Sequence, residues 1–153
     1  MAGAAHAQVV RLTSRDREVA RQLFATMAEV FGQGCESLSD DYLDRLLARE
    51  DFWALAARVG DLIVGGLTAH TLPLTSSSSS EIFIYDIAVR ADYQRQGVGR
   101  RLLTDLRRRA AASAIGVVFV SADNADTGAL DFYRALGGAA SPVTFYTFAS
   151  GGT

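Results

Sequence analysis

The chain has 153 residues, of which 49% are hydrophobic and 21% are charged, proportions ordinary for one globular domain over residues 1–153. Its formal net charge of −2 supplies no global basic field, so we expect no nucleic-acid partner. No apolar stretch approaches membrane-spanning length and no signal peptide is evident, which predicts a cytoplasmic protein without membrane contact.

Cysteine usage points the same way. Cys35 is the only cysteine of the sequence, so no intramolecular disulfide can form, and a reducing cytosol suits the protein. No histidine stands near it to make it a nucleophile, and His70 lies in an apolar segment typical of a strand. We therefore expect Cys35 to be a thiol without a catalytic role, and we expect no metal site.

Hydrophobic periodicity and turn residues define the elements of the first half. Thr13 or Ser14 is predicted to cap the first helix and Ser39 the second, because short hydroxyl side chains bond the free amides of a first turn. The serine tract Ser76–Ser80 is predicted to be a hairpin loop. The predicted elements are strand Val9–Leu12, a helix to about Phe31, a helix after Ser39, and strands Phe52–Arg58 and Leu62–Leu72.

The second half alternates strands and helices. The predicted elements are strand Glu81–Val89, helix Gly99–Ser113, strand Val117–Ala122, helix Asp126–Leu136 and a final strand near Val143–Phe148. The resulting order, βααβββαβαβ, predicts an α/β (α+β) fold class.

A glycine loop, Gln94–Gly99, joins the strand ending at Val89 to an Arg-rich helix. Its backbone amides and the positive end of the helix form a cradle for an anion, and Gly97 and Gly99 carry no Cβ to hold a phosphate away. The P-loop pattern is excluded because the chain has no lysine. The dinucleotide-binding pattern fails because Leu102 stands where its third glycine belongs.

The pattern Q-x-x-G-x-G of this loop resembles the pyrophosphate loop of the GNAT superfamily, the acetyl-CoA-dependent N-acetyltransferases. Alone, the pattern is also compatible with an ordinary strand-to-helix loop. Two further elements are similar to the family and stand in the right order. They are Ile87-Ala88-Val89 before the loop and the A-x-x-x-Y-x-x-x-G pattern of Ala129, Tyr133 and Gly137 after it.

The resemblance implies a GNAT fold, with a central mixed, mostly antiparallel sheet that is splayed between its fourth and fifth strands and flanked by helices. It implies acetyl-CoA as cosubstrate. The residues it implies for acetyl-CoA binding are Ile87, Ala88, Val89, Arg95, Gln96, Gly97, Val98, Gly99, Arg100 and Asp126. Asp126 stands where many members have Asn, and only one strand follows Gly138 where the family pairs two.

Two residues are assigned catalytic roles, one from the resemblance and one from its place in the sequence. Tyr133 stands where the family places the general acid that protonates the leaving thiolate, with a core aromatic as the alternative. Asp86 is the favoured base, because a charge inside the apolar run IFIYDIAV is costly unless it is paired or useful. The alternative is a carboxylate that merely pairs with an Arg.

The facing of Asp86 is predicted from strand alternation. Alternation puts its side chain on the side of Ile82, Ile84 and Ala88 and opposite Tyr85. In the family a bulge in this strand, predicted to lie just after Asp86, aims a backbone amide near Ile87 or Ala88 at the thioester carbonyl.

Carboxylates indicate the acceptor. An acid-lined cleft favours a polycationic amine, although a solvated acidic helix face explains the cluster at 36–51 equally well. The sequence is similar to the aminoglycoside 3-N-acetyltransferases of type I, in the blocks at 40–57, 80–103 and 120–137. The residues predicted to bind the acceptor are Asp86, Asp123, Asp126, Glu36, Asp40 and Asp41.

The resemblance leaves rival functions open. The acceptor could instead be a polyamine, a peptide N-terminus or a small metabolite, with the same fold and cosubstrate. A noncatalytic acyl-CoA-binding module is the rival of another class, against which Tyr133 and Asp86 argue, because binding alone requires neither. The family often forms homodimers, so a homodimer is a possible state.

Overall fold

The computed structural model describes residues 7–151 of the chain. Its contacts divide the chain into two compact units, one ending at Ser121 and the other beginning at Ala122. The first unit contains the whole β-sheet of the described residues, and the second contains one α-helix. The single domain expected from length stays a prediction.

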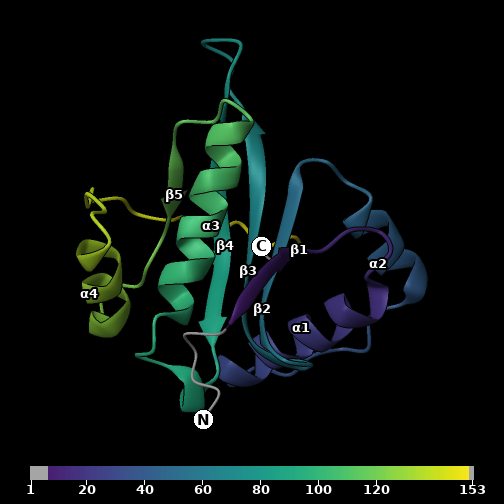
Figure 1. Cartoon of the computed structure of the whole chain (residues 1–153). Helices are drawn as coiled ribbons and strands as arrows, with labels where there is room; N and C mark the ends of the chain where they lie inside the picture. Colours follow the sequence, from purple (N-terminus) through teal and green to yellow (C-terminus); the bar gives the residue numbers. More distant parts are fainter. Residues whose placement is uncertain (1–6, 152–153) are drawn as a thin grey trace. The chain divides into compact units, whose positions relative to one another are not determined.

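Five strands of the described chain form one open sheet in the order β1-β2-β3-β4-β5 (Figure 1). Neighbouring strands are antiparallel, except that β4 and β5 run parallel. This confirms the predicted mixed, mostly antiparallel sheet. The strands are β1 (Gln8–Arg11), β2 (Phe52–Val59), β3 (Leu62–Pro73), β4 (Ser80–Val89) and β5 (Val118–Val120).

Helices pack on both faces of the sheet (Figure 1). Helices α1 (Arg17–Val30) and α2 (Asp40–Leu47) lie on one face, and α3 (Val98–Ala112) lies on the other. Gly66 of β3 lets α1 approach closely, because a Cβ there would lie 2.2 Å from Leu23 Cδ1. Helix α4 (Thr127–Ala135) belongs to the second unit.

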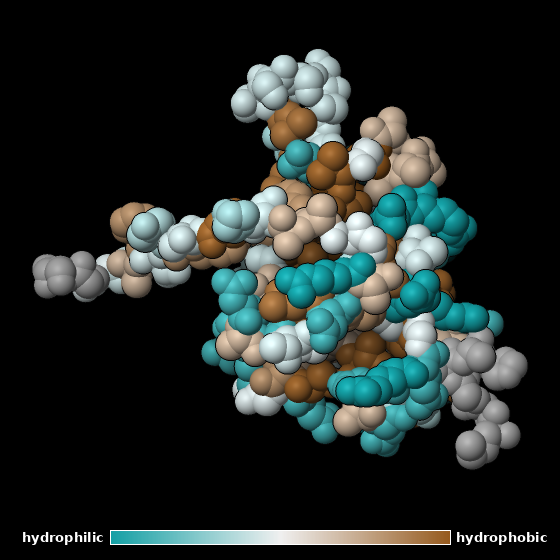
Figure 2. Space-filling view, turned by 90° about the vertical axis from the view of Figure 1, so that its left-hand side faces the viewer, coloured by the Kyte–Doolittle hydropathy of each residue, from teal (hydrophilic) through white to brown (hydrophobic). Residues whose placement is uncertain are grey.

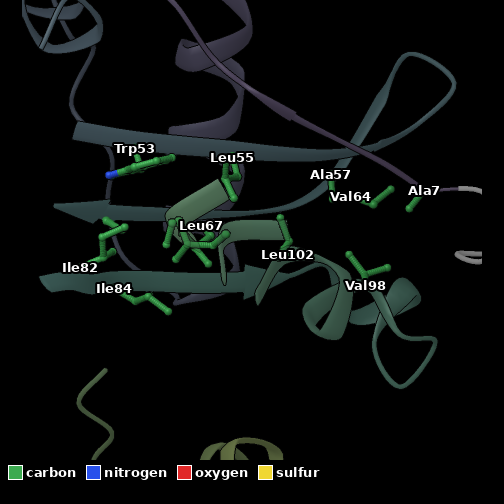
Figure 3. Packing of buried hydrophobic residues seen from close by; sticks show 13 residues of the cluster. Ala7, Trp53, Leu55, Ala57, Val64, Leu67, Ile82, Ile84, Val98 and Leu102 are labelled. Atoms are coloured by element: carbon green, nitrogen blue, oxygen red, sulfur yellow. The ribbon is translucent and has the colours of Figure 1, made fainter. Parts of the chain in front are cut away.

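Each face of the sheet has its own hydrophobic cluster. On the α3 face, Trp53, Leu55 and Leu67 of the sheet pack with Leu102 of α3 (Figure 3). Burial on α3 recurs every fourth residue from Val98 to Ala110, the stripe expected of an amphipathic helix. On the other face, Leu23 and Leu43 of α1 and α2 pack on Ala54 and Ala88, so the two clusters show which way each sheet residue points.

The caps of the first two helices test the capping predictions. Ser39 caps α2 as predicted, with its Oγ accepting from Tyr42 N at 3.1 Å. The cap predicted for α1 at Thr13 or Ser14 is wrong, because α1 starts later and Asp16 is its N-cap residue. The Asp16 carboxylate accepts from Thr13 N at 2.7 Å and from the Thr13 hydroxyl at 3.1 Å. Thr13 Oγ1 in turn accepts from Arg15 N at 3.3 Å, so the carboxylate and the hydroxyl hold the turn before α1 together.

The predicted final strand near Val143–Phe148 is also wrong, since these residues form no strand. Strand structure requires a neighbour that pairs with its backbone groups. No described segment pairs with this one. Four large apolar side chains of the stretch are exposed, namely Val143, Phe145, Tyr146 and Phe148.

The loop between β3 and β4 contains most of the serine tract, as predicted, although Ser80 already belongs to β4. The loop stands at the top of Figures 1 and 2, and in Figure 2 it has the pale colours of near-neutral hydropathy. Among the described residues, no helix is both long and apolar enough to cross a membrane.

Candidate functional site

The loop after β4 makes a sharp, left-handed turn into α3. A short 3₁₀ helix, Ala91–Tyr93, leads out of the strand. Arg95 then has φ 61° and Gly97 has φ 86°, and Gly97 becomes the N-cap residue of α3. Residues Gln94 to Gly97 are exposed, so the predicted anion cradle is open to a ligand.

Helix α3 begins without a capping side chain, unlike α2 and α4. Its first intrahelical bond runs from Arg101 N to Gly97 O at 3.0 Å, so the amides of Val98–Arg100 lack an acceptor inside the helix. The first turn holds no acidic residue, and a Cβ on Gly97 would meet no protein atom within 4 Å. Free amides, the helix dipole and open space together fit a pyrophosphate.

The sheet splays next to this loop. Strand β4 pairs with β5 only from Ile82 to Ile84, so within the described part of the chain the stretch from Tyr85 to Val89 has no strand on that side. This confirms the predicted splay between the fourth and fifth strands. Gln94 Nε2 donates to Val89 O at 2.9 Å and ties the loop to the strand. The open edge suits pantetheine, whose amides can bond strand backbone groups.

A β-bulge changes the facing of Asp86. In the β3–β4 register Thr68 pairs with Asp86 and Ala69 pairs with Ile84, so Tyr85 is the extra residue. A bulge was predicted just after Asp86. This position is wrong, because the observed bulge lies at Tyr85, just before Asp86.

The bulge also reverses the predicted side-chain pattern of β4. Ile82 and Ile84 lie in the α3 cluster, whereas Ala88 lies in the α1/α2 cluster. Asp86, two residues before Ala88 in regular strand, shares the face of Ala88 and not that of Ile84. The predicted grouping with Ile82 and Ile84 is wrong, because the extra residue shifts the alternation by one.

Asp86 is a partly buried carboxylate without a partner among residues 7–151. No hydrogen bond or ion pair of the described residues reaches its side chain, so the alternative of a pair with Arg is not realised within them. Burial raises the pKa of its carboxyl above the ordinary value for Asp. An unpaired carboxylate with a raised pKa has the properties required of a general base.

The acidic segment at 36–51 is partly neutralised. Arg17 donates to both oxygens of Asp44, at 2.8 and 2.7 Å, and this bonding holds the pKa of Asp44 below its ordinary value. Asp40 pairs with Arg17 at 3.3 Å and also with Arg21. Asp40 therefore serves largely to join α1 and α2.

The rest of the predicted acceptor cluster stays exposed. Glu36 and Asp41 are exposed and take part in no ion pair of the described part of the chain. Both flank the start of α2, which packs against β2, whereas Asp86 lies on β4. The structure thus places these carboxylates and Asp86 on the same side of the sheet but on separate elements.

The second unit holds three predicted site residues. Asp126 caps α4 by accepting from Ala129 N at 3.0 Å, and Asp123 Oδ1 accepts from Ala125 N at 2.8 Å. Both carboxylates therefore already accept hydrogen bonds from backbone amides of the turn that leads into α4. Tyr133 lies in the last turn of α4, with its ring centroid 5.2 Å from that of Phe132.

The sequence reasoning missed a set of aromatic side chains next to Asp86. His70 and Tyr85 lie with their ring centroids 6.1 Å apart, and Tyr85 and Phe83 lie 6.2 Å apart. The alternation of Phe83 and Tyr85 within IFIYDIAV was the available signal. This signal was overlooked because the whole run has the composition of a buried strand, in which aromatic residues are expected in the core.

Comparison with known proteins identifies relatives of this chain. A family profile described as "Acetyltransferase (GNAT) family" matches residues 10–137. Among curated proteins, none matches significantly.

Solved structures give closer comparisons. The aminoglycoside acetyltransferase meta-AAC0020, from an uncultured soil metagenomic sample and in complex with trehalose, is 33% identical, with a TM-score of 0.88 over 95% of this chain and 98% of that one. A structure of the same protein with sisomicin is 32% identical, with a TM-score of 0.88 and the same coverage. The aminoglycoside acetyltransferase HMB0005, also from an uncultured soil metagenomic sample, is 33% identical, with a TM-score of 0.87 over 94% of this chain and 99% of that one.

Proposed function

Because the chain belongs to the GNAT family of acetyltransferases, we propose that its acceptor is an aminoglycoside, acetylated at the 3-amino group of the deoxystreptamine ring. The GNAT fold and the use of acetyl-CoA are properties of the family. The acceptor is supported by the two soil-metagenome relatives, which are aminoglycoside acetyltransferases at 33% identity. One of them is in complex with sisomicin, an aminoglycoside.

The single observation that carries the proposal is Asp86. Its carboxylate is partly buried, has no partner among the described residues, and lies where β4 leaves β5. An aminoglycoside amine is protonated near neutral pH and must lose a proton before it attacks. Asp86 accepts that proton, directly or through one water, and the raised pKa of its carboxyl makes it a better acceptor than an ordinary Asp.

Acetyl-CoA supplies the activated acetyl thioester. The amides from Arg95 to Arg100 would hold its pyrophosphate, and Arg95 and Arg100 would add positive charge. The open edge from Ile87 to Val89 would hold the pantetheine, with the amide of Ile87 or Ala88 as donor to the thioester oxygen.

Two further groups complete the proposal. The hydroxyl of Tyr133 would give its proton to the leaving thiolate. Glu36 and Asp41 remain available for the ammonium groups of the drug, whereas Asp40, Asp123 and Asp126 already make the contacts described above and would contribute less.

The proposal is tested by thiol release from acetyl-CoA with a panel of amines, namely gentamicin, sisomicin, spermidine and a peptide with a free N-terminus. We expect turnover with the two drugs, and we expect Asp86→Asn to lower kcat by about 10²–10⁴-fold. Raising the pH toward the pKa of the amine should restore part of the rate. The matched control is Asp61→Asn, which changes an exposed carboxylate in the β2–β3 turn.

Different outcomes identify different errors. Turnover of spermidine or the peptide without turnover of any drug would remove the aminoglycoside and keep the acetyltransferase. A higher KM with an unchanged kcat in Asp86→Asn would make Asp86 a ligand of the acceptor and not the base.

A further inference from the structure

Aromatic side chains form a row across the sheet on the face of α1 and α2. Neighbouring rings along it have centroids 5.1–6.4 Å apart, within the range of aromatic contact. We call these residues the aromatic row. In order of contact they are Phe24, Phe52, His70, Tyr85, Phe83 and Phe119.

Strand register explains why the rings meet. Phe52 pairs with His70 across β2 and β3, and His70 pairs with Phe83 across β3 and β4. Cross-strand partners share a face, and Phe52 belongs to the α1/α2 cluster, so the row lies on that face.

The bulge then brings Tyr85 and Asp86 to this same face. Tyr85 contacts the rings of His70 and Phe83, while Asp86 shares the side of Ala88. In a regular strand, two consecutive side chains point to opposite faces. The extra residue at Tyr85 therefore places an aromatic ring beside the unpaired carboxylate, which no regular strand can do.

Exposure varies along the row and is greatest at Tyr85. Phe52 is 7% exposed near α1, whereas Tyr85 is 65% exposed and Phe119 is 41% exposed. Tyr85 is the first residue of β4 beyond its pairing with β5, whereas Phe83 and Phe119 still pair with each other. A half-open aromatic surface beside an uncompensated negative charge is complementary to a molecule that has both apolar C–H faces and ammonium groups.

We propose that Tyr85, supported by His70 and Phe83, is a platform that binds the acceptor and selects cyclic polyamines over linear ones. This inference rests on the proposed function. A saturated ring of the drug lies with its C–H face on the aromatic face and an ammonium group over Tyr85, and the amine that reacts reaches Asp86. Linear polyamines offer charges to the carboxylate but no ring face to the platform.

The test uses Tyr85→Ala and Tyr85→Phe in the full chain, with steady-state thiol release and calorimetry of gentamicin binding. We expect Tyr85→Ala to raise the KM and Kd for gentamicin by about 3- to 30-fold, the range of a cation–π contact. The kcat and the KM for acetyl-CoA should stay within about twofold. Tyr85→Phe keeps the ring and should retain the parent values.

The matched control is Phe31→Ala, which removes a 42% exposed aromatic ring outside the row. It should leave the gentamicin Kd unchanged. The KM for spermidine should change less in Tyr85→Ala than the KM for gentamicin, because only the cyclic acceptor uses the ring face.

Two results would overturn the platform while leaving the proposed function intact. One is a gentamicin Kd in folded Tyr85→Ala equal to that of the parent, with the parent turning over the drug. The other is an equal rise of both acceptor KM values together with that for acetyl-CoA, which would indicate a distorted strand. A parent that neither binds nor acetylates gentamicin would refute the proposed function, and the platform with it.

Discussion

Replacing Gly97 by Ala tests the anion cradle most directly. Gly97 has φ +86°, a conformation that costs an L residue about 1–2 kcal/mol. The new Cβ would meet no protein atom within 4 Å, so this strain is the whole expected cost to the fold. For a chain of this length, the strain corresponds to a lower Tm by about 2–8 °C.

The substitution should also weaken the binding of acetyl-CoA, independently of its effect on stability. Gly97 immediately precedes the first-turn amides of α3, and its Cβ would enter the open space beside this N-cap residue, where we place the pyrophosphate. Losing one charge-assisted hydrogen bond there costs about 1.5–3 kcal/mol, which corresponds to a Kd about 10- to 100-fold higher.

Gly60 provides the matched control, because it has φ +59° in the β2–β3 turn and also has no neighbour within 4 Å of a Cβ. Gly60→Ala should lower the Tm by a similar amount without changing the Kd for acetyl-CoA, measured by calorimetry. Pantetheine, which lacks the pyrophosphate, should bind equally to both variants. If folded Gly97→Ala bound acetyl-CoA as tightly as Gly60→Ala, the cradle assignment would be refuted.

Three other substitutions have defined outcomes. Tyr133→Phe should lower kcat by about 10–1000-fold with the ring retained, and an unchanged kcat where chemistry limits turnover would remove Tyr133 from the mechanism. Asp86→Asn should raise the Tm at neutral pH, because burial raises the pKa of the Asp86 carboxyl and its ionisation therefore destabilises the folded state. That gain should shrink as the pH falls through the folded-state pKa and vanish below about 4, the ordinary Asp value, and a gain independent of pH would contradict this cause. Gly66→Ala should lower the free energy of unfolding, measured in urea, by about 1–3 kcal/mol, because its Cβ would lie 2.2 Å from Leu23 Cδ1. A variant as stable as the parent would show that α1 can move away at no cost.

Sequence alone was sufficient for features that depend on near neighbours in the chain. The Ser39 cap needs only the amide of Tyr42, three residues on. The predicted glycine loop and the helix that follows it also depend on adjacent residues, from Gln94 to the first turn of α3. The order of strands and helices up to α4 was likewise predicted from local periodicity. The apolar residues of one helix or strand recur within a single continuous segment, so their spacing can be read without knowing any distant contact.

Tertiary structure decided what depends on partners distant in the sequence. Arg17 and Asp44 are 27 residues apart, so their pairing, which offsets part of the negative charge of the segment at 36–51, could not be inferred from charge counts. The segment near Val143–Phe148 has the composition of a strand, yet composition does not provide the neighbour that a strand requires.

The bulge at Tyr85 is the most consequential of these features. Alternation within β4 alone predicted one face for Asp86, and pairing with β3 put it on the other. The register between two strands is set by how both fit their packed faces, and one extra residue reverses every side chain beyond it. The sequence could therefore nominate Asp86, but only the paired strands decide that it lies beside the aromatic row.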